Sequence, residues 1–249
     1  MGKRIITQRR GRGTNTYKVS KKAFRFKLKY PKMLSGEGKV TKLFNSAAHS
    51  APLAKINSDS GSFYMPAFKN MVEGQLISFE TITSPKRDQS KGQKISFDNK
   101  IGNGNIIKLK NIPVKTHIYN IESKPGDGGV FIKSAGNSAI VNKVVGEHIF
   151  VLMPSKKEKK FHHNCRATIG VIAGAGRLDK PIVKAGKKYH IKKSKSKLWP
   201  RTSAVKMNAI DHPFGSGRGK NPKSKVAKKN APPGKRVGLL RPKRTGKKK

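Results

Sequence analysis

The residues best suited to chemistry lie between Met207 and Gly219, where the pair Asp211-His212 precedes a proline and glycine then recurs at every second position. An aspartate next to a histidine suggests an acid–base pair. However, adjacent side chains do not readily orient each other, and Ser216 is the one evident nucleophile nearby. Asp211 is better suited to an Asx-type turn, and the glycines let the backbone approach a sugar-phosphate or a base edge. We therefore expect a binding loop here and not a catalytic site.

Two other glycine-containing segments match nucleotide-binding motifs only in part. Residues 214–221 end in Gly219-Lys220, as a phosphate-binding loop would, but they lack its first glycine and its closing Ser or Thr, and a proline follows. The segment Gly174-Ala175-Gly176 lacks the third glycine of a dinucleotide-binding turn. Nucleotide-dependent chemistry is therefore disfavoured.

His162, His163 and Cys165 form a further group that could ligate a metal. A structural zinc site needs four ligands, usually in two pairs, and the sequence offers no second pair. We expect no catalytic residue, no protein-bound metal and no cofactor.

The charge of the chain identifies the class of partner. The 249 residues include 57 Lys and Arg against 12 Asp and Glu, for a net charge of +45. A compact protein with this charge repels itself, and the phosphate backbone of a nucleic acid is the obvious counter-charge. An anionic membrane surface is the other candidate, but the sequence has no run of 18 apolar residues and no visible signal peptide. The single cysteine, Cys165, suits a reducing compartment.

The charge is uneven along the chain, and this locates the domains. Residues 1–32 hold twelve basic residues and no acid, and residues 190–249 hold twenty and one. Residues 33–110 and 111–189 have net charges of only +5 and +9. We therefore expect a globular centre between two basic arms. The predicted regions are an amino-terminal arm over 1–35, one domain over 36–110, a second over 111–190, and a carboxy-terminal extension over 191–249.

The centre is predicted to be all-β. Between residues 39 and 110 the apolar residues mostly alternate, and turn signals such as 58–61 and 102–105 separate the runs. Five or so short strands at this spacing favour a small antiparallel barrel of the OB type. The expected strands contain Val40 to Phe44, Leu53 to Ile56, Phe63 and Met65, Leu76 to Phe79, Ile95 and Phe97, and Ile106 to Leu109.

A second set of strands follows and has the composition of a small SH3-like barrel. The expected strands are 116–121, 130–132, 139–145, 147–152 and 159–162, with a strong turn signal at 126–129. An apolar, glycine-rich strip flanked by arginines then runs from Arg166 to Arg177.

The two arms lack a core-forming pattern. In the first, glycines are interleaved with Arg9, Arg10 and Arg12, which predicts a chain that is flexible alone and ordered in a nucleic-acid complex. After His190 the chain loses periodicity and is rich in proline and lysine, so we expect irregular structure. Apolar residues such as Trp199 favour ordered docking of the first half of this carboxy-terminal arm.

Several stretches resemble the universal large-subunit ribosomal protein L-two family, in its archaeal and eukaryotic form. The matches run in order over nearly the whole chain. They are Gly2-Lys3-Arg4 with residues 8–13, residues 120–129, 134–136 and 166–177, residues 179–181 and 184–186, residues 199–200, 207–208 and 211–215, and residues 230–234 and 244–246.

The resemblance implies an OB-fold-like barrel followed by an SH3-like barrel, with long basic irregular extensions threaded into large-subunit rRNA. It implies a structural role in subunit assembly, in subunit association and in supporting the peptidyl-transferase region, where the chemistry belongs to RNA. The partners would be large-subunit rRNA and other ribosomal proteins of a cytoplasmic ribosome, with no membrane, no homo-oligomer, and Mg²⁺ only as rRNA-bound ions. The residues expected to bind rRNA are Arg9, Arg10, Arg12, Arg166, Arg177, Lys180, Lys184, Arg201, Met207, Asn208, His212, Gly215, Arg218, Arg236 and Arg244.

A rival interpretation keeps the charge but has no fixed site. A free nucleic-acid chaperone or a chromatin-like protein would lose affinity similarly for any RNA as the salt concentration rises. A ribosomal protein would keep a preference for its own rRNA helix.

Overall fold

The computed structural model describes residues 2–19, 23–79, 102–217, 226–227 and 230–240. The expected strand residues Ile95 and Phe97 lie outside these ranges, as do Arg218 and Arg244. The chain divides into two compact units. We call Lys21–Val183 the strand unit, and Met1–Ser20 together with Lys184–Lys249 the arm unit.

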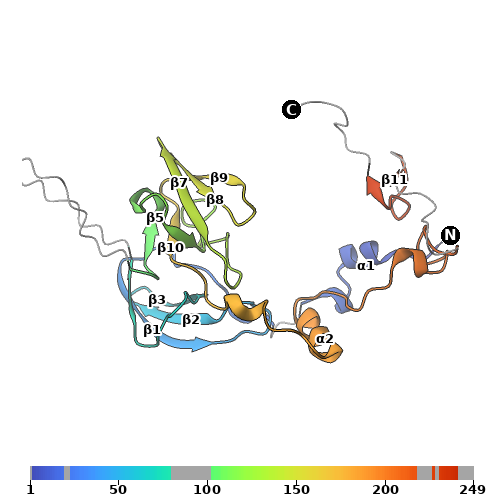
Figure 1. Cartoon of the computed structure of the whole chain (residues 1–249), viewed down its shortest axis with the longest axis horizontal. Coiled ribbons are helices and arrows are strands. Elements are labelled where there is room, and N and C mark those ends of the chain that lie inside the picture. The colour runs from blue at the N-terminus through green and yellow to red at the C-terminus, as the bar shows by residue number, and fades with distance from the viewer. Residues whose placement is uncertain (1, 20–22, 80–101, 218–225, 228–229, 241–249) are drawn as a thin grey trace, which may run out of the picture. The chain divides into compact units, whose positions relative to one another are not determined.

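The strand unit is built on a ten-stranded sheet, which confirms the all-β prediction and is consistent with a barrel-type fold (Figure 1). The strand order is β3-β2-β1-β4-β5-β10-β6-β7-β8-β9. Among the described neighbours, β4 and β5 pair parallel and the others pair antiparallel. The strands are β1 (Gly36–Phe44), β2 (Leu53–Ser58), β3 (Gly61–Pro66), β4 (Leu76–Phe79), β5 (Ile106–Lys108), β6 (His117–Tyr119), β7 (Ala139–Val145), β8 (His148–Leu152), β9 (Glu158–His162) and β10 (Arg166–Ile169).

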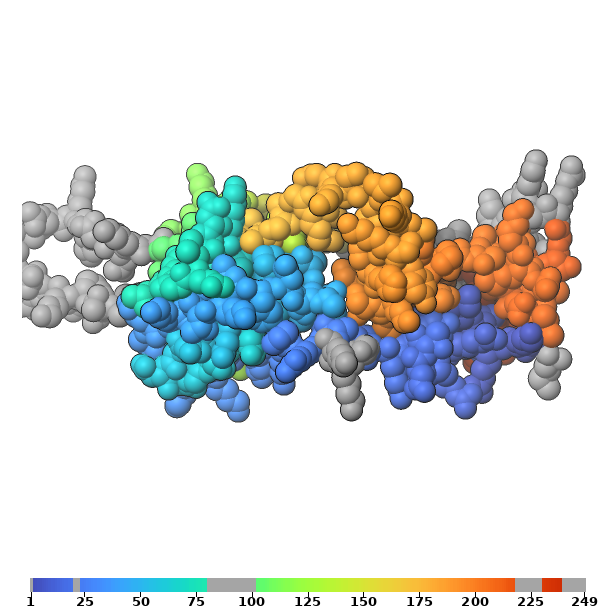
Figure 2. Space-filling view, turned by 90° about the horizontal axis from the view of Figure 1, so that it is seen from below, coloured from blue at the N-terminus to red at the C-terminus, as the bar shows by residue number. Residues whose placement is uncertain are grey.

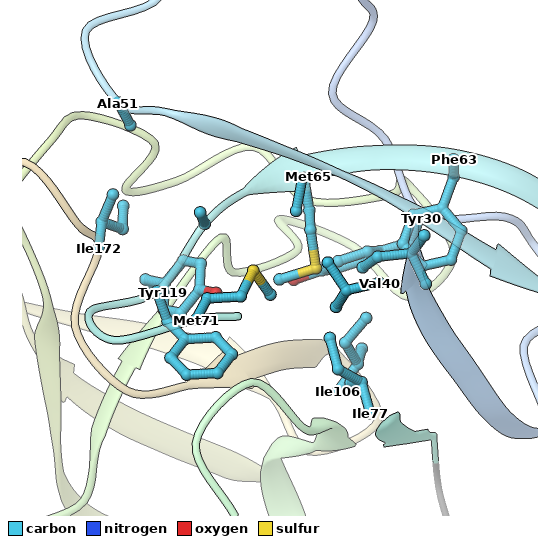
Figure 3. Close-up of a cluster of buried hydrophobic side chains, with 14 of the residues drawn as sticks. Tyr30, Val40, Ala51, Phe63, Met65, Met71, Ile77, Ile106, Tyr119 and Ile172 are labelled. Atoms are coloured by element: carbon cyan, nitrogen blue, oxygen red, sulfur yellow. The ribbon is translucent and has the colours of Figure 1, made fainter. Parts of the chain in front are cut away.

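The first half of the sheet encloses one hydrophobic core. The alternation on β1 places Gly38 and Val40 inside and Lys39, which lies between them, outside. Gly38 must lack a side chain, because a Cβ there would lie 2.5 Å from Phe79 and 2.8 Å from Ile56. Figure 3 shows the side chains of this core, which include Tyr30, Val40, Phe63, Met65, Met71, Ile77, Ile106, Tyr119 and Ile172.

The second half encloses a separate core. The tight corner expected near residue 146 joins β7 to β8, with Gly146 at φ +54°. Where a strand was expected at residues 130–132, the structure has an isolated bridge, which pairs Phe131 with Ile121. The core residues include Leu109, Ile118, Ile121, Val141, Ile149, Val151, Phe161, Cys165 and Ile169.

Strand β10 lies between the two halves of the sheet. Arg166 pairs with Lys108 of β5, and Thr168 pairs with Tyr119 of β6. All four residues of β10 are buried. Arg166 and Thr168 are buried although they are polar, so the alternation of residue types along β10 does not mark a solvent-exposed face.

Two helices in the arm unit were not expected from the sequence. They are α1 (Ile6–Arg12) and α2 (Ala185–Ser194), and neither contains a buried residue. Such helices have no apolar face, so periodicity could not reveal them. Local features still favour α1: Gln8 Oε1 accepts a hydrogen bond from Ile5 N at 3.1 Å, and Gly13 ends the helix at φ +71°.

In its described residues the arm unit also contains two short 3₁₀ elements and one two-stranded sheet. The 3₁₀ turns are η1 (Asn15–Tyr17) and η4 (Ala204–Lys206). Strands β11 (Val226–Ala227) and β12 (Leu239–Leu240) pair parallel. In the strand unit, η2 (Leu109–Asn111) follows β5 and η3 (Ala175–Arg177) follows β10.

The compact units do not coincide with the four predicted regions. Leu28, Tyr30 and Leu34 fall in the predicted amino-terminal arm, yet they are buried in the strand unit. Helix α2 crosses residue 190, the predicted end of the second barrel. The predicted limits therefore stay predictions, whereas the arrangement into two units is what the contacts define.

Candidate nucleic-acid interface

The segment that contains Asp211-His212, residues 207–217, folds by hydrogen bonds within its own backbone. We call it the His212 loop. Ser216 N donates to Met207 O at 3.0 Å, and Asp211 N donates to Asn208 O at 3.0 Å. The Asp211 bond forms a backbone turn over residues 208–211, and the expected Asx-type turn at the Asp211 side chain stays a prediction. Gly215 N donates to His212 O at 2.8 Å, so the loop is closed without an apolar core.

Gly215 is the residue that allows this closure. It is buried under the backbone of the preceding turn, where a Cβ would lie 2.3 Å from Asn208 O and 2.6 Å from Met207 O. Both contacts are to backbone atoms, which cannot move aside as a flexible side chain can. The glycine is therefore needed for the loop's own packing, in addition to any close approach to a ligand.

His212 is held in one orientation at the surface of this loop. Its Nδ1 accepts a hydrogen bond from Phe214 N at 3.0 Å, and the two rings meet edge to face at 5.2 Å. Partial burial lowers the pKa of His212 below its ordinary value. The neutral ring that accepts at Nδ1 carries its proton on Nε2, so it can donate one hydrogen bond to a ligand.

The amino-terminal residues lie against the His212 loop (Figure 2). Lys3 N donates to Ile210 O at 2.9 Å, and a Cβ on Gly2 would come within 3.0 Å of the same oxygen. Lys3 Nζ lies 3.9 Å from Asp211 Oδ1, which at this exposure is a weak pair. The sequence predicts two separate arms, and nothing in residue type signals this backbone contact.

The structure gathers most of the predicted rRNA-binding residues in the arm unit. The side chains of Arg9, Arg10 and Arg12 project from α1 into solvent. Met207 is half-buried, and Arg218 and Arg244 lie outside the described residues. The other predicted residues that are exposed are Lys184, Arg201, Asn208 and Arg236 in the arm unit, and Arg177 and Lys180 in the strand unit.

Arg166 differs from the other predicted residues because its guanidinium group is buried. Its Nη2 donates to Glu122 Oε1 at 2.7 Å and its Nε to the same oxygen at 3.1 Å, while its Nη1 donates to Lys32 O at 3.3 Å. The two paired side chains are 7% and 0% exposed. This internal partnership gives Arg166 a role in holding β10, and its contact with rRNA stays a prediction that this geometry does not favour.

Glu122 also organises the turn that follows it. Its carboxylate accepts hydrogen bonds from Gly128 N at 3.0 Å, Gly126 N at 3.3 Å and Arg166 N at 2.8 Å. Gly128 O in turn accepts from Tyr30 N at 2.9 Å. The turn predicted at residues 126–129 therefore surrounds a buried carboxylate with backbone N–H donors, and it belongs to the framework of the strand unit.

The strand unit carries one more basic feature, a cleft of about 370 Å³. Its walls come from residues 68–70, 115–117 and 169–171 together with Asn103. Lys69, Lys115 and His117 are exposed at its edge. The sequence does not reveal this group, because the three residues come from two separate segments and form no motif.

The described residues also bear on two alternatives, a metal site at His162, His163 and Cys165 and a membrane partner. Cys165 is buried, and burial raises the pKa of its thiol to about 11. His162 Nδ1 accepts from Asn164 N at 3.2 Å. In the part of the chain that the structure describes, no group of three or more His, Cys, Asp or Glu is placed to hold a metal ion. Among the same residues, no helix is long and apolar enough to cross a membrane.

Comparison with known proteins gives a consistent result. Residues 102–233 match the family model described as Ribosomal Proteins L2, C-terminal domain. The large ribosomal subunit protein uL2 of Archaeoglobus fulgidus is 42% identical over 251 residues, which cover 99% of each chain. The proteins of the same name from Methanococcoides burtonii and Hyperthermus butylicus are 40% and 38% identical over 253 residues, covering 99% and 100% of this chain and the whole of each relative.

Proposed function

The chain belongs to the ribosomal protein L2 family and is a structural constituent of the large ribosomal subunit, and from this we propose that it binds large-subunit rRNA mainly through its arm unit. In this role it supports subunit assembly, subunit association and the peptidyl-transferase region during translation. The ribosome in which it works is cytoplasmic, and it contacts other ribosomal proteins there without forming a homo-oligomer.

The observation that carries this proposal is the charge of the arm unit. Over its whole sequence this unit contains 29 Lys and Arg and a single acidic residue, Asp211. Side chains of this kind neutralise phosphates and release condensed counterions. Aromatic residues are only 7% of the chain, so base stacking is a minor part of the binding. Exposed arginines on α1 and the carboxy-terminal segments are suited to contacts with the backbone of a folded RNA.

The His212 loop supplies the contact near the catalytic centre. Its backbone is closed by internal hydrogen bonds, and the His212 ring keeps Nε2 as a donor. A single fixed donor can position an RNA group but provides no nucleophile or proton relay. Peptidyl transfer is therefore carried by rRNA, and the protein acts as a support, with Mg²⁺ present only as ions bound to the RNA.

Salt-dependent binding tests the proposal. The full chain is titrated with large-subunit rRNA and with an unrelated structured RNA of equal length, at a series of salt concentrations. We expect affinity for both to fall as salt rises, and the preference for the ribosomal RNA to persist. If both RNAs lose affinity in parallel with no preference, the protein is a general polyanion binder and the proposal fails.

Reconstitution of subunits tests the role of His212. The variant His212→Ala should leave the strand unit folded and should reduce assembly or the rate of peptide-bond formation. The exposed His148 on β8 offers a matched control, and His148→Ala should behave as the unchanged protein. Normal assembly and a normal rate with His212→Ala would show that His212 has no such role.

A further inference from the structure

A second hollow lies within the arm unit, where parts of both arms meet. Its volume is about 480 Å³. Its walls come from Thr7, Arg10 and Gly11 on α1, from Tyr17 in η1, and from residues 195–197, which follow α2. The two sides of the hollow are therefore more than 170 residues apart in the sequence, as the contact between Ser196 and Tyr17 illustrates.

The wall after α2 is fixed by the way that helix ends. Lys197 N donates to Lys192 O at 2.9 Å and Ser196 N donates to Lys193 O at 3.0 Å. Ser196 has φ +54°, so the chain reverses at this residue in the manner of a helix C-terminal cap. The Ser196 hydroxyl then donates to Tyr17 O, which joins the turn to the amino-terminal arm.

The groups that line the hollow suit an anion. Arg10, Lys195 and Lys197 supply three cationic side chains, and Thr7 and Tyr17 supply hydroxyl donors. Gly11 leaves open space, since nothing lies within 4 Å of the position of a Cβ. Among these described lining residues none is acidic. The hollow also falls within the 300–1,000 Å³ range that is usual for ligand sites, here about 480 Å³.

The attraction must come from side chains and not from helix ends. The hollow lies beside the carboxy-terminal turns of α1 and α2, where the helix dipole carries about half a negative charge and disfavours an anion. Three full positive charges outweigh that partial charge. Arginine binds a phosphate through two parallel N–H groups, and lysine acts as a point charge.

We propose that this hollow is a phosphodiester-binding site in which Arg10 from the amino-terminal arm and Lys197 from the carboxy-terminal arm hold the same phosphate group of rRNA. The site rests on the proposed rRNA binding and makes it more specific. Because each arm provides part of the site, the phosphate links the two arms, and neither arm alone completes it.

A double-mutant cycle tests whether the two cations share one phosphate. The variants Arg10→Gln, Lys197→Gln and the double variant are titrated with large-subunit rRNA. Each single variant should lose about 10-fold in affinity. The double variant should also lose about 10-fold, because the second change acts on a site already emptied. The slope of log affinity against log salt should fall by about 1 in all three variants.

Arg9 provides the matched control. It is exposed and lies beside Arg10 in the last turn of α1, but it is not part of the hollow. The changes Arg9→Gln and Lys197→Gln should therefore act independently, so that their losses multiply and the slope falls by about 2 in the double variant. The ring centroid of Trp199 lies 5.1 Å from Lys188 Nζ, so the fluorescence of Trp199 reports whether the arm unit of each variant remains folded.

The outcomes separate this inference from the proposed function. If Arg10→Gln and Lys197→Gln multiply in the same way as the control pair, the two cations bind different groups and the shared site is wrong. If neither variant changes the affinity while the unchanged protein binds rRNA, the hollow is not an RNA site. If the unchanged protein does not prefer large-subunit rRNA, the proposed function itself fails.

Discussion

Replacing Gly215 by alanine should open the His212 loop. The new Cβ would lie 2.3 Å from Asn208 O and 2.6 Å from Met207 O, whereas ordinary van der Waals contact begins at 3.4 Å. The backbone must therefore move by about 1 Å, and overpacking of this kind costs about 1–3 kcal/mol. Met207 O is also the acceptor for Ser216 N at 3.0 Å, so the same movement weakens a hydrogen bond of about 1 kcal/mol. The closed loop should lose about 2–4 kcal/mol in total.

Amide hydrogen exchange measures this loss directly. A change of about 2 kcal/mol corresponds to an increase of about 30-fold in the open population, so exchange at Ser216 N should become at least that much faster. Gly217→Ala is the matched control, because nothing lies within 4 Å of a Cβ at Gly217, and the change there should stay within about 0.5 kcal/mol. Exchange at Val141 N in the strand unit should be unchanged in both variants. Equal exchange at Ser216 in the two variants would refute the packing role of Gly215.

The remaining predictions concern titration and the buried ion pair. Replacing Glu122 by Gln leaves Arg166 buried without its counter-charge, so the free energy of unfolding should fall by about 3–5 kcal/mol. Urea unfolding followed by circular dichroism measures this loss. A loss no larger than that of the exposed control Glu147→Gln would contradict the prediction. The buried thiol of Cys165, whose pKa is raised from 9.0 to about 11 mainly by burial, should react with iodoacetamide at pH 8 only after unfolding, and rapid labelling of the folded protein would show that it is accessible. Between pH 9 and 11 the thiol of Cys165 loses its proton more readily in the unfolded state than in the folded state, so its contribution to the free energy of unfolding should decrease as pH rises. The difference in unfolding free energy between the unchanged protein and Cys165→Ser, followed over this pH range, measures that decrease. Burial lowers the pKa of His212 below 6.5, so the unfolded state binds the proton first as pH falls and the stability of the arm unit should decrease below pH 6.5; an NMR titration of His212 with a midpoint at or above 6.5 would contradict this.

Local patterns predicted the strands well where one face of a strand is buried. The alternation around Val40 predicted strand β1, and the turn signal near Gly146 predicted the hairpin of β7 and β8; the structure contains both. The pattern was less informative for β10, which is buried on both faces, and for α1 and α2, which are buried on neither. Periodicity reports a difference between two faces, so it carries no information when the faces are alike.

The sequence predicted a type of site, which stays a prediction, but it did not predict the arrangement of the residues. The charge of the arms and the glycines after His212 indicated a binding loop for a polyanion. The bond from Lys3 N to Ile210 O could not be foreseen, since a backbone N–H is available at almost every residue. The partner of Arg166 could not be foreseen either, because the side chain of Glu122 reaches it across 44 residues of sequence.

The sequence by itself determined the all-β class and the uneven charge, and it predicted a binding loop at residues 207–217, since these depend on residue type and local spacing. Only the tertiary structure decided that Arg166 is an internal partner, that Gly215 is a packing residue, and that the two arms form one unit. Each of these depends on contacts between distant residues, many of them through backbone atoms that every residue shares. The His212 loop is therefore a folded element held by the amino-terminal arm, and its glycine serves the loop's own closure before it can serve any ligand.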